Sequence, residues 1–273
     1  MANITYRDIV RALHELELNQ TNDVVAHVSL SSLGDVRGGA ETVIGALLAT
    51  CGTVVMPAFT HQTTVWPASG PADNGCVYSD HTAENARAAM FSPDLPVDPD
   101  LGQVAEAFRR HPQAKRSHHP VLSFAAAGVH AEEILATQTL QDPLGPLDWL
   151  YDRHGDVLLM GVDHRANVTL HLAEKFAGRK QFVRWALTPR RVVECPGFPG
   201  CSDGFNAIGP RLAYTVRQEW AGQAQLQAVP IFNLVGVTQD WLEANPLALL
   251  CNHSYCERCR AIRTEFARFA QKH

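Results

Sequence analysis

Two short, continuously apolar segments constrain the fold of this chain more than any other feature. They are Val24–Val28 and Thr53–Ala58, and between them lie a polar loop, Ser29–Gly39, and a predicted helix over residues 40–50. Strands that are apolar on both faces are typical of sheets that helices cover on both sides. The sequence therefore predicts an α/β fold, with a mixed central sheet covered by helices on both faces.

The other segments extend this α/β pattern along the chain. Thr5–Asp8 resembles a capping box and precedes a stripe of apolar residues at helical spacing, which predicts an amphipathic first helix. Further predictions are helices at 101–110, 130–136 and 146–153, and strands at 121–127 and 156–161. Residues 61–100 are irregular, and no linker divides the chain. We expect a single domain over residues 1–273, with irregular insertions and a cysteine-rich C-terminal region.

The composition excludes several classes of protein. The 273 residues include 23 Lys and Arg against 28 Asp and Glu, a formal charge of −5, whereas nonspecific nucleic-acid binding needs a basic face. No apolar run reaches the roughly 18 residues of a membrane span, and the first residues lack the pattern of an export signal. We expect a cytoplasmic monomer or homodimer whose acidic balance favours small cationic ligands.

The segment from Leu158 to Glu174 carries the strongest signal for chemistry. An apolar strand ends at Gly161, and polar residues follow where a helix should begin. Ligands bind beyond the carboxyl ends of strands in open α/β sheets. His171 and Glu174 are three residues apart and share a helix face, so His171 could accept a proton while Glu174 fixes its tautomer. The alternative is a capped helix with a buried, hydrogen-bonded histidine.

Two further segments suit phosphate or carbonyl groups. Ser29–Gly39 joins a strand to a helix N-terminus, so its backbone N–H groups could face such oxygens, although a plain connection is an equal alternative. Lys115–Pro120 holds two cations and two imidazoles, which suits an anionic group, although such runs usually form solvated turns. The chain has no dinucleotide-binding or P-loop fingerprint.

The cysteines predict a metal site. An odd count of seven in a chain without an export signal indicates a metal site or free thiols rather than disulfides. Zinc accepts four thiolates at spacings such as the Cys-x-x-Cys pair near the C-terminus. The preferred ligands are Cys201, Cys251, Cys256 and Cys259, with Cys195 or His253 as substitutes. We expect structural zinc to stabilise residues 190–273, and free buried thiols are the alternative.

A serine hydrolase is a competing hypothesis. Gly200–Gly204 matches the Gly-x-Ser-x-Gly pattern, with Ser202 as nucleophile and His171 as base. That motif needs a strand before it, and Glu194–Pro199 cannot easily form a central strand because it contains two prolines. The hydrolase hypothesis therefore has little support from the sequence.

Four ordered segments resemble the aminoglycoside 3-N-acetyltransferase family. They are His27–Gly34, Met56–Thr60, Arg116–Pro120 and Asn167–Glu174. The resemblance covers roughly residues 1–180, and Val28 departs from the serine that members often carry. The tail resembles the apramycin-acetylating branch more loosely, through Glu194, Cys201 and Cys256–Cys259.

The resemblance implies direct acetyl transfer from acetyl-CoA to the 3-amino group of an aminoglycoside, with His171 as general base and Glu194 assisting at the substrate side. It implies an acetyl-CoA site formed by His27, Ser29, Ser31, Ser32, Leu33, Gly34, Phe59, Thr60, Arg116, Ser117 and His119. It implies acceptor contacts from Asp163, Asn167, Thr169, Glu174 and Asp203. Another amine metabolite as the acceptor is the alternative.

Overall fold

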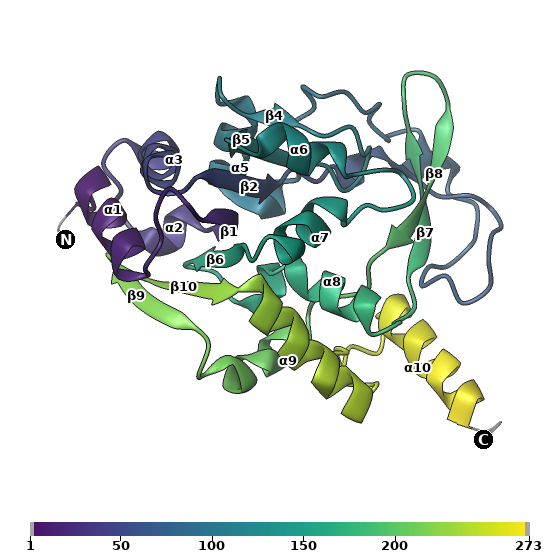
Figure 1. Ribbon diagram of the computed structural model, residues 1–273. Helices are drawn as coiled ribbons and strands as arrows, with labels where there is room; N and C mark the ends of the chain where they lie inside the picture. Colours follow the sequence, from purple (N-terminus) through teal and green to yellow (C-terminus); the bar gives the residue numbers. More distant parts are fainter. Residues whose placement is uncertain (1–2, 271–273) are drawn as a thin grey trace.

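A seven-stranded sheet forms the centre of the computed structural model, which describes residues 3–270 (Figure 1). From edge to edge its strands are β4 (Lys115–Arg116), β5 (Phe124–Gly128), β2 (Thr53–Pro57), β1 (Asp23–Val28), β6 (Asp156–Met160), β10 (Ala224–Pro230) and β9 (Arg217–Ala221). Strands β2, β1 and β6 are parallel, and the strands on either side pair antiparallel. The predicted mixed central sheet is confirmed.

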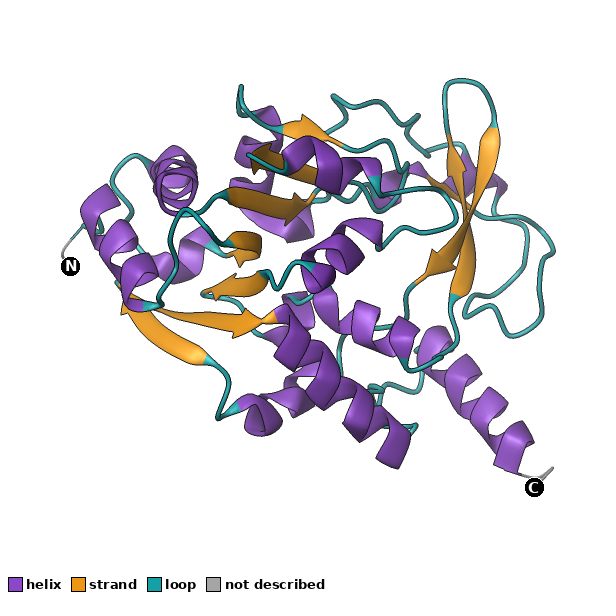
Figure 2. Cartoon of the chain, viewed as in Figure 1, coloured by secondary structure: helices purple, strands orange, loops and turns teal. Residues whose placement is uncertain are grey.

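Helices cover both faces of this sheet (Figure 2). One face carries α1 (Tyr6–Glu15), α3 (Gly39–Thr50) and α5 (Gly102–Arg110), and the other carries α6 (Ala131–Ala136), α7 (Gly145–Asp152), α8 (Thr169–Phe176) and α9 (Ile231–Ala244). Val24 and Ala26 of β1 pack in the hydrophobic core under α1, α3 and α5, and Val25 packs in the core under α6 to α9. Successive side chains of a strand point to opposite faces of the sheet. The apolar character of the central strands thus follows from burial on both faces.

A second, three-stranded sheet lies beside the central sheet. Its strands are β3 (Thr64–Val65), β7 (Phe182–Leu187) and β8 (Val192–Phe198), with β8 at one edge. The remaining elements are α2 (Leu30–Leu33), α4 (Thr82–Asn85), α10 (Glu257–Ala270) and the 3-10 helices η1 (His61–Thr63), η2 (Pro99–Leu101), η3 (His164–Ala166) and η4 (Phe205–Leu212). Pro196 lies in β8, and an edge strand is where a sheet tolerates proline.

The first helix and the irregular region follow the sequence-based expectation. Oγ1 of Thr5 accepts a hydrogen bond from the backbone N–H of Asp8, and the Asp8 carboxylate accepts one from the backbone N–H of Thr5. The predicted capping box of α1 is therefore confirmed. Residues 61–100 contain only short elements, namely η1, β3, α4 and the start of η2.

One strand begins later than the sequence predicts. The apolar residues from Val121 predict a strand, but β5 begins at Phe124. Nδ1 of His119 accepts hydrogen bonds from the backbone N–H groups of Val121 and Leu122, at 3.2 and 2.9 Å. These bonds close a turn, so the two residues are buried without joining the sheet.

Gly161 ends β6 and turns the chain toward α8. Its φ is +68°, and a Cβ atom at this position would lie 2.7 Å from Cβ of Ser32. Glycine is therefore required both by the left-handed backbone and by the close approach of the segment after β1. This turn brings α8 to the carboxyl ends of β1 and β6. Among residues 3–270, no helix has the length and apolar character needed to cross a membrane.

Candidate active site

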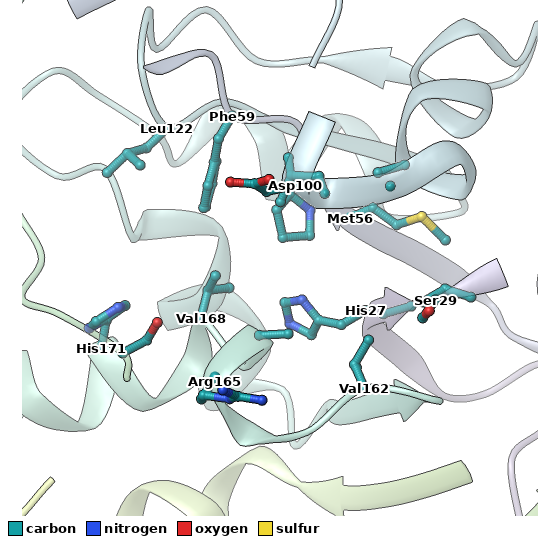
Figure 3. A pocket seen from close by; sticks show the side chains of 18 of the residues that line it. His27, Ser29, Met56, Phe59, Asp100, Leu122, Val162, Arg165, Val168 and His171 are labelled. Carbon is teal, nitrogen blue, oxygen red and sulfur yellow. The ribbon is translucent and has the colours of Figure 1, made fainter. Parts of the chain in front are cut away.

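A cavity of about 870 Å³ lies beyond the carboxyl ends of the parallel strands (Figure 3). His27 of β1 and Met56 of β2 line it from the sheet, Ser29 lines it from the segment after β1, and His171 lines it from α8. In Figure 3, Ser29 and His171 lie toward opposite sides of the cavity, with His27 between them. This is the edge of an open α/β sheet at which ligands bind.

His171 and Glu174 form a buried pair on α8. Nδ1 of His171 lies 2.7 Å from Oε2 of Glu174, and their side chains are only 8% and 6% exposed. Nη1 of Arg179 donates to Oε1 of Glu174 at 2.6 Å, and Nη2 donates to the carbonyls of Pro246 and Ala248. Because Glu174 engages Nδ1, Nε2 is the ring atom of His171 that can accept a proton from a ligand.

The surroundings of Glu174 favour its ionised form. Burial alone raises the pKa of this carboxyl group, but the hydrogen bonds and charges of His171 and Arg179 outweigh burial and lower the pKa of Glu174. An ionised Glu174 holds a proton on Nδ1 of His171 and leaves Nε2 as the acceptor. The ring of Phe205 packs on His171, with 4.7 Å between centroids. The arrangement can therefore present a fixed, proton-accepting imidazole to the cavity.

His27 is a second imidazole in the cavity, and it is uncharged at neutral pH. Burial lowers the pKa of His27 to about 3. Its Nε2 is buried and has no hydrogen-bond partner among the residues that the structure describes. Buried polar atoms normally have a partner, so His27 is a candidate for a hydrogen bond to a bound ligand.

The structure brings some of the residues predicted for acetyl-CoA to the cavity and not others. Those that line it are His27, Ser29, Ser31, Gly34 and Phe59. Those outside its lining are Ser32, Leu33, Thr60, Arg116, Ser117 and His119. The acetyl-CoA contacts of all these residues stay predictions.

Polar residues of the second group bond to the protein itself. Arg116 donates to three backbone carbonyls, including that of Ala58 at 2.6 Å. Oγ1 of Thr60 donates to the carbonyl of Pro120 at 2.8 Å. His119 closes the turn before β5. In the structure these side chains stabilise the loops at the ends of β2 and β5.

The residues predicted for the acceptor lie outside the cavity lining. They are Asp163, Asn167, Thr169, Glu174, Asp203 and the proposed assisting residue Glu194. Oδ1 of Asn167 accepts from the backbone N–H of Thr169 at the start of α8. Asp163 forms an ion pair with Arg165, and hydrogen bonds from Arg165 lower the pKa of Asp163 to about 2. These contacts order the segment between β6 and α8.

Glu194 and Asp203 are less enclosed. Glu194 is exposed on β8, and Nε1 of Trp185 donates to its carboxylate at 3.3 Å. Asp203 lies 3.8 Å from Nε2 of His253, with both side chains about half exposed. The roles of Glu194 and Asp203 toward an acceptor stay predictions.

Several lining residues were not singled out from the sequence. Arg165, His61 and Arg258 bring two cations and an imidazole to the cavity. Nδ1 of His61 lies 2.5 Å from Oδ2 of Asp98, which makes a second pair of histidine and carboxylate. His61 comes from the irregular region and Arg258 lies inside the Cys-x-x-Cys pair, and neither position carries a periodic or spacing signal.

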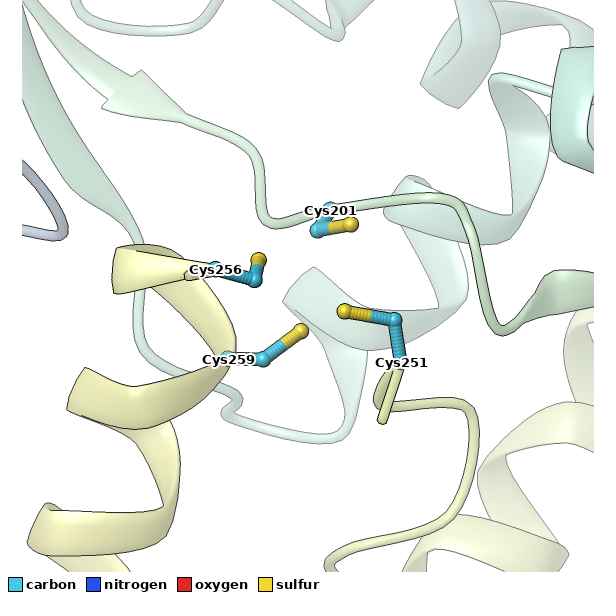
Figure 4. Close-up of side chains that lie close together, drawn as sticks. All are labelled: Cys201, Cys251, Cys256 and Cys259. Atoms are coloured by element: carbon cyan, nitrogen blue, oxygen red, sulfur yellow. The ribbon is translucent and has the colours of Figure 1, made fainter. Parts of the chain in front are cut away.

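Four cysteine side chains converge near the C-terminus (Figure 4). The Sγ atoms of Cys201, Cys251, Cys256 and Cys259 lie within 4.8 Å of one another. Sulfur atoms in a tetrahedral zinc site, each about 2.3 Å from the ion, are about 3.8 Å apart, so a small contraction would fit a metal ion. The preferred set of four could thus hold a metal, and the substitutes Cys195 and His253 are not part of the cluster.

Curated proteins with similar sequences are related to aminoglycoside acetyltransferases. The SPbeta prophage-derived aminoglycoside N(3')-acetyltransferase-like protein YokD of Bacillus subtilis is 38% identical over 176 residues, which cover 62% of this chain and 64% of YokD. Aminoglycoside N(3)-acetyltransferase VII of Streptomyces paromomycinus is 36% identical over 196 residues, which cover 66% of this chain and 64% of that enzyme. The match thus spans less than two thirds of the length of these relatives.

Solved structures with the same fold cover nearly the whole chain. The aminoglycoside acetyltransferase AAC(3)-IVa apoenzyme has a TM-score of 0.78 at 28% identity and covers 97% of this chain and 98% of its own. A variant of that enzyme in complex with apramycin has a TM-score of 0.72 at 27% identity, covering 90% and 95%. The AAC-IIIb complex with CoASH has a TM-score of 0.73, covering 89% and 97%, and at 23% identity it shows the fold alone.

The family profile agrees with these relatives. The profile described as Aminoglycoside 3-N-acetyltransferase matches residues 25–243, which include most of β1, all of β2, β6 and α8, and most of the residues that line the cavity. The match covers most of the chain, and the expected resemblance is confirmed. This chain belongs to the aminoglycoside 3-N-acetyltransferase family.

Proposed function

We propose that this protein transfers the acetyl group of acetyl-CoA to an amino group of an aminoglycoside, with His171 as the general base. The observation that carries the proposal is the buried His171–Glu174 pair, which borders a cavity of about 870 Å³ in a member of this family. The acetyltransferase family to which the chain belongs supports acetyl transfer, and a solved relative that binds apramycin supports an aminoglycoside as the acceptor.

The chemistry needs a group that removes one proton from the amine. A neutral amine attacks the carbonyl carbon of the thioester, and Nε2 of His171 accepts the proton that the nitrogen loses. The tetrahedral intermediate then releases the CoA sulfur, which takes a proton as the C–S bond breaks. The products are the N-acetyl amide and CoA thiol. Ionised Glu174 stabilises the imidazolium that forms on His171 between these steps.

The cavity has two ends that suit the two substrates. Ser29, Ser31 and Gly34 line the cavity, and the two serines offer hydroxyl groups, which supports an acetyl-CoA site there. His27 lies between Ser29 and His171 (Figure 3), and its neutral ring can hydrogen-bond a carbonyl group without adding charge. The acceptor would then approach from the side of His171.

The cysteine cluster supports a structural zinc ion, held by Cys201, Cys251, Cys256 and Cys259. When bound, the ion would tie the loop after β8 to the start of α10 and contribute folding free energy. Residues 190–273 would be the zinc-stabilised part of a single domain over residues 1–273.

The hydrolase hypothesis has less support. Ser202 lines the same cavity as His171, but within residues 3–270 no hydrogen bond joins the two side chains. The strand before the motif, β8, is an edge strand that ends at Phe198, and a 3-10 helix follows. A nucleophile elbow requires a central strand and an α-helix at these places.

The test is a thiol-release assay with acetyl-CoA and a panel of aminoglycosides, followed by mass spectrometry of the product. We expect free CoA thiol and an N-acetylated antibiotic with at least one member of the panel. Absence of thiol release with every aminoglycoside would reject the proposed acceptor class. Labelling by a fluorophosphonate probe that Ser202→Ala abolishes would favour the hydrolase instead.

A further inference from the structure

Arg179 is placed beside Glu174 by the way in which α8 ends. Gly178 has a φ of +71°, and its backbone N–H donates to the carbonyl of Lys175, while the backbone N–H of Arg179 donates to the carbonyl of Glu174 at 2.9 Å. These two bonds form a Schellman motif, in which a left-handed glycine ends the helix and turns the chain back over the last turn. The backbone of Arg179 therefore returns to the residue whose carboxylate its side chain contacts.

The side chain of Arg179 joins Glu174 to the segment that precedes the cysteine cluster. Nη1 donates to Oε1 of Glu174 at 2.6 Å, and Nη2 donates to the carbonyls of Pro246 and Ala248 at 2.6 and 2.8 Å. The side chain is only 4% exposed. A lysine would supply the same charge but not this planar set of N–H donors. The guanidinium group is therefore held in one position by two segments of the chain.

Arg179, Glu174 and His171 form a row of three buried groups. The carboxylate of Glu174 meets Arg179 through Oε1 and Nδ1 of His171 through Oε2, at 2.6 and 2.7 Å. Because each oxygen of the carboxylate has one of these partners, Arg179 acts on His171 through Glu174. Nε2 of His171, at the far end of the row, is the atom left for a ligand in the cavity.

Other charged groups near α8 do not bond to this row. Lys175 of α8 pairs with Asp142. On the elements packed against α8, the charged side chains are Asp148 and Asp152 of α7, Asp240 and Glu243 of α9, and Arg211 of η4. The titratable side chains that share the cavity with His171 are His27, His61, Asp100, Arg165 and Arg258. Within residues 3–270, none of them forms a hydrogen bond or ion pair with His171 or Glu174.

The charge of Arg179 affects how readily the pair takes up a proton. When His171 and Glu174 together hold one proton, their charge is −1 and Arg179 cancels it. A second proton leaves the buried row with a net positive charge, which repulsion and burial disfavour. Without Arg179, the second proton would instead neutralise a buried carboxylate, and the pair would take it up at a higher pH. A pair that already holds two protons cannot accept one from an amine.

We propose that Arg179 is a positioning residue for acetyl transfer, which orients Glu174 and keeps the His171–Glu174 pair free to accept a proton near neutral pH. The inference rests on the proposed function, in which His171 is the general base. It adds a third member to the pair and connects the base to residues 246–248.

The test is the pH dependence of kcat/KM, measured by thiol release with an aminoglycoside that the wild type acetylates. The proteins compared are the wild type, Arg179→Gln, Arg179→Lys and Glu174→Gln. The acid limb of such a profile reports proton uptake by the essential base, and here it belongs to the coupled pair rather than to one residue. The titration of the amine is the same for every protein, so it cancels from the comparison.

We expect the two single losses of charge to move the acid limb in opposite directions. In Arg179→Gln the limb should move up by about 1 pH unit or more, so that the loss of kcat/KM is greater at about pH 6 than at about pH 9. In Glu174→Gln it should move down, because the imidazolium loses its anion and keeps the cation of Arg179 nearby. In Arg179→Lys the limb should lie closer to that of the wild type.

Arg109→Gln is the matched control for the loss of a buried ion pair. The side chain of Arg109 is 8% exposed and pairs with Glu106 at 2.7 Å, but Arg109 does not line the cavity. We expect Arg109→Gln to unfold at a lower temperature and to keep the acid limb of the wild type. A limb that moves equally in Arg109→Gln and Arg179→Gln would assign the shift to lost stability and overturn the proposal.

The double variant Glu174→Gln/Arg179→Gln protects the test against a folding failure of Arg179→Gln, because it removes both buried charges and leaves neither unpaired. Its kcat should be close to that of Glu174→Gln, since Arg179 acts through Glu174. A further loss of about 10-fold or more relative to Glu174→Gln would show that Arg179 acts independently of Glu174 and would overturn the proposal.

Three other outcomes decide the matter. An acid limb of Arg179→Gln that stays at the wild-type position, or moves down, would reject the proposed role of the charge, as would a limb in Arg179→Lys that moves as far as in Arg179→Gln. Wild-type turnover in His171→Gln would instead reject the proposed general base itself. Loss of turnover in His171→Gln together with an unmoved limb in Arg179→Gln would leave the proposed function intact and reject only the role of Arg179.

Discussion

Nη1 of Arg258 donates a hydrogen bond to the backbone carbonyl of Gly200, at a distance of 2.9 Å. This bond ties the first turn of α10 to the loop after β8, and that loop lies against the His171–Glu174 pair. Cys201 and Cys259, the neighbours of these two residues, belong to the same thiol cluster. The cysteine cluster is therefore placed to support the geometry of the cavity as well as the stability of the C-terminal region.

Removal of a cysteine ligand should weaken both stability and activity. We expect elemental analysis to find about one zinc ion per wild-type chain, and none in Cys259→Ser. The variant should unfold at a lower temperature and lose activity, because the loop at Gly200 loses its anchor. Cys76→Ser, which lies outside the cluster, should keep zinc and activity. A wild-type protein that is free of metal and unaffected by chelators would contradict this prediction.

Replacement of Glu174 should impair both catalysis and folding. In Glu174→Gln, the tautomer of His171 is no longer fixed by a carboxylate, and kcat should fall about 100-fold or more. The variant also leaves Arg179 buried without its counter-ion, at a cost of about 3–5 kcal/mol in the free energy of unfolding.

The pH dependence of that cost follows from the lowered pKa of Glu174. A carboxyl group that is more acidic in the folded than in the unfolded state stabilises the fold at neutral pH. That stabilisation is lost as the pH falls through the lowered value. Urea unfolding at about pH 7 and about pH 3 should therefore show a larger difference between wild type and Glu174→Gln at the higher pH than at the lower one. A constant difference would argue that packing, not charge, is responsible.

His27 should matter for the affinity for acetyl-CoA and little for stability. Its Nε2 has no partner in the described chain, so His27→Asn breaks no hydrogen bond of that atom, whereas loss of one bond to a ligand should raise the KM for acetyl-CoA about 3-fold to 10-fold. His130→Asn is the contrasting variant, because His130 pairs with Asp23 and does not line the cavity. It should lower the unfolding temperature and leave the KM unchanged. A lower unfolding temperature and an unchanged KM for acetyl-CoA in His27→Asn would show that His27 stabilises the fold rather than binds the ligand.

Two glycines with a positive φ separate backbone strain from close packing. Gly161 and Gly178 have φ values of +68° and +71°, but only Gly161 has heavy atoms near the position of a Cβ. Gly178→Ala should cost about 1 kcal/mol in the free energy of unfolding, from the left-handed backbone. Gly161→Ala should cost more and reduce activity, because Ser32, whose hydroxyl group donates to the lining residue Ser29, must move. Equal costs in urea unfolding would mean that the contact with Ser32 relaxes freely.

The central part of the fold could be predicted because its determinants are local in the sequence. Val24–Val28 and Thr53–Pro57 are apolar on both faces, as two helical layers require. The three-residue spacing of His171 and Glu174 places them on one helix face, and the structure joins them by a hydrogen bond. The four cysteines also converge as their spacing indicates.

The rest depends on contacts between distant segments. Arg116 donates to three backbone carbonyls, including that of Ala58, and no sequence pattern reveals these contacts. Arg184 and Arg258 are 74 positions apart in the numbering and meet only because β7 and α10 lie beside a second, smaller cavity. No periodic or spacing pattern in the sequence links two such positions.

The most direct test of the proposed mechanism is the turnover number of His171→Gln beside that of His61→Gln, measured by thiol release with an amine that the wild type acetylates. Both histidines pair with a carboxylate and line the cavity, so the comparison asks which one is the base. We expect His171→Gln to bind CoA normally and to lose about 10²-fold to 10⁴-fold in kcat, with a much smaller loss for His61→Gln. A kcat in His171→Gln equal to that of the wild type would contradict it.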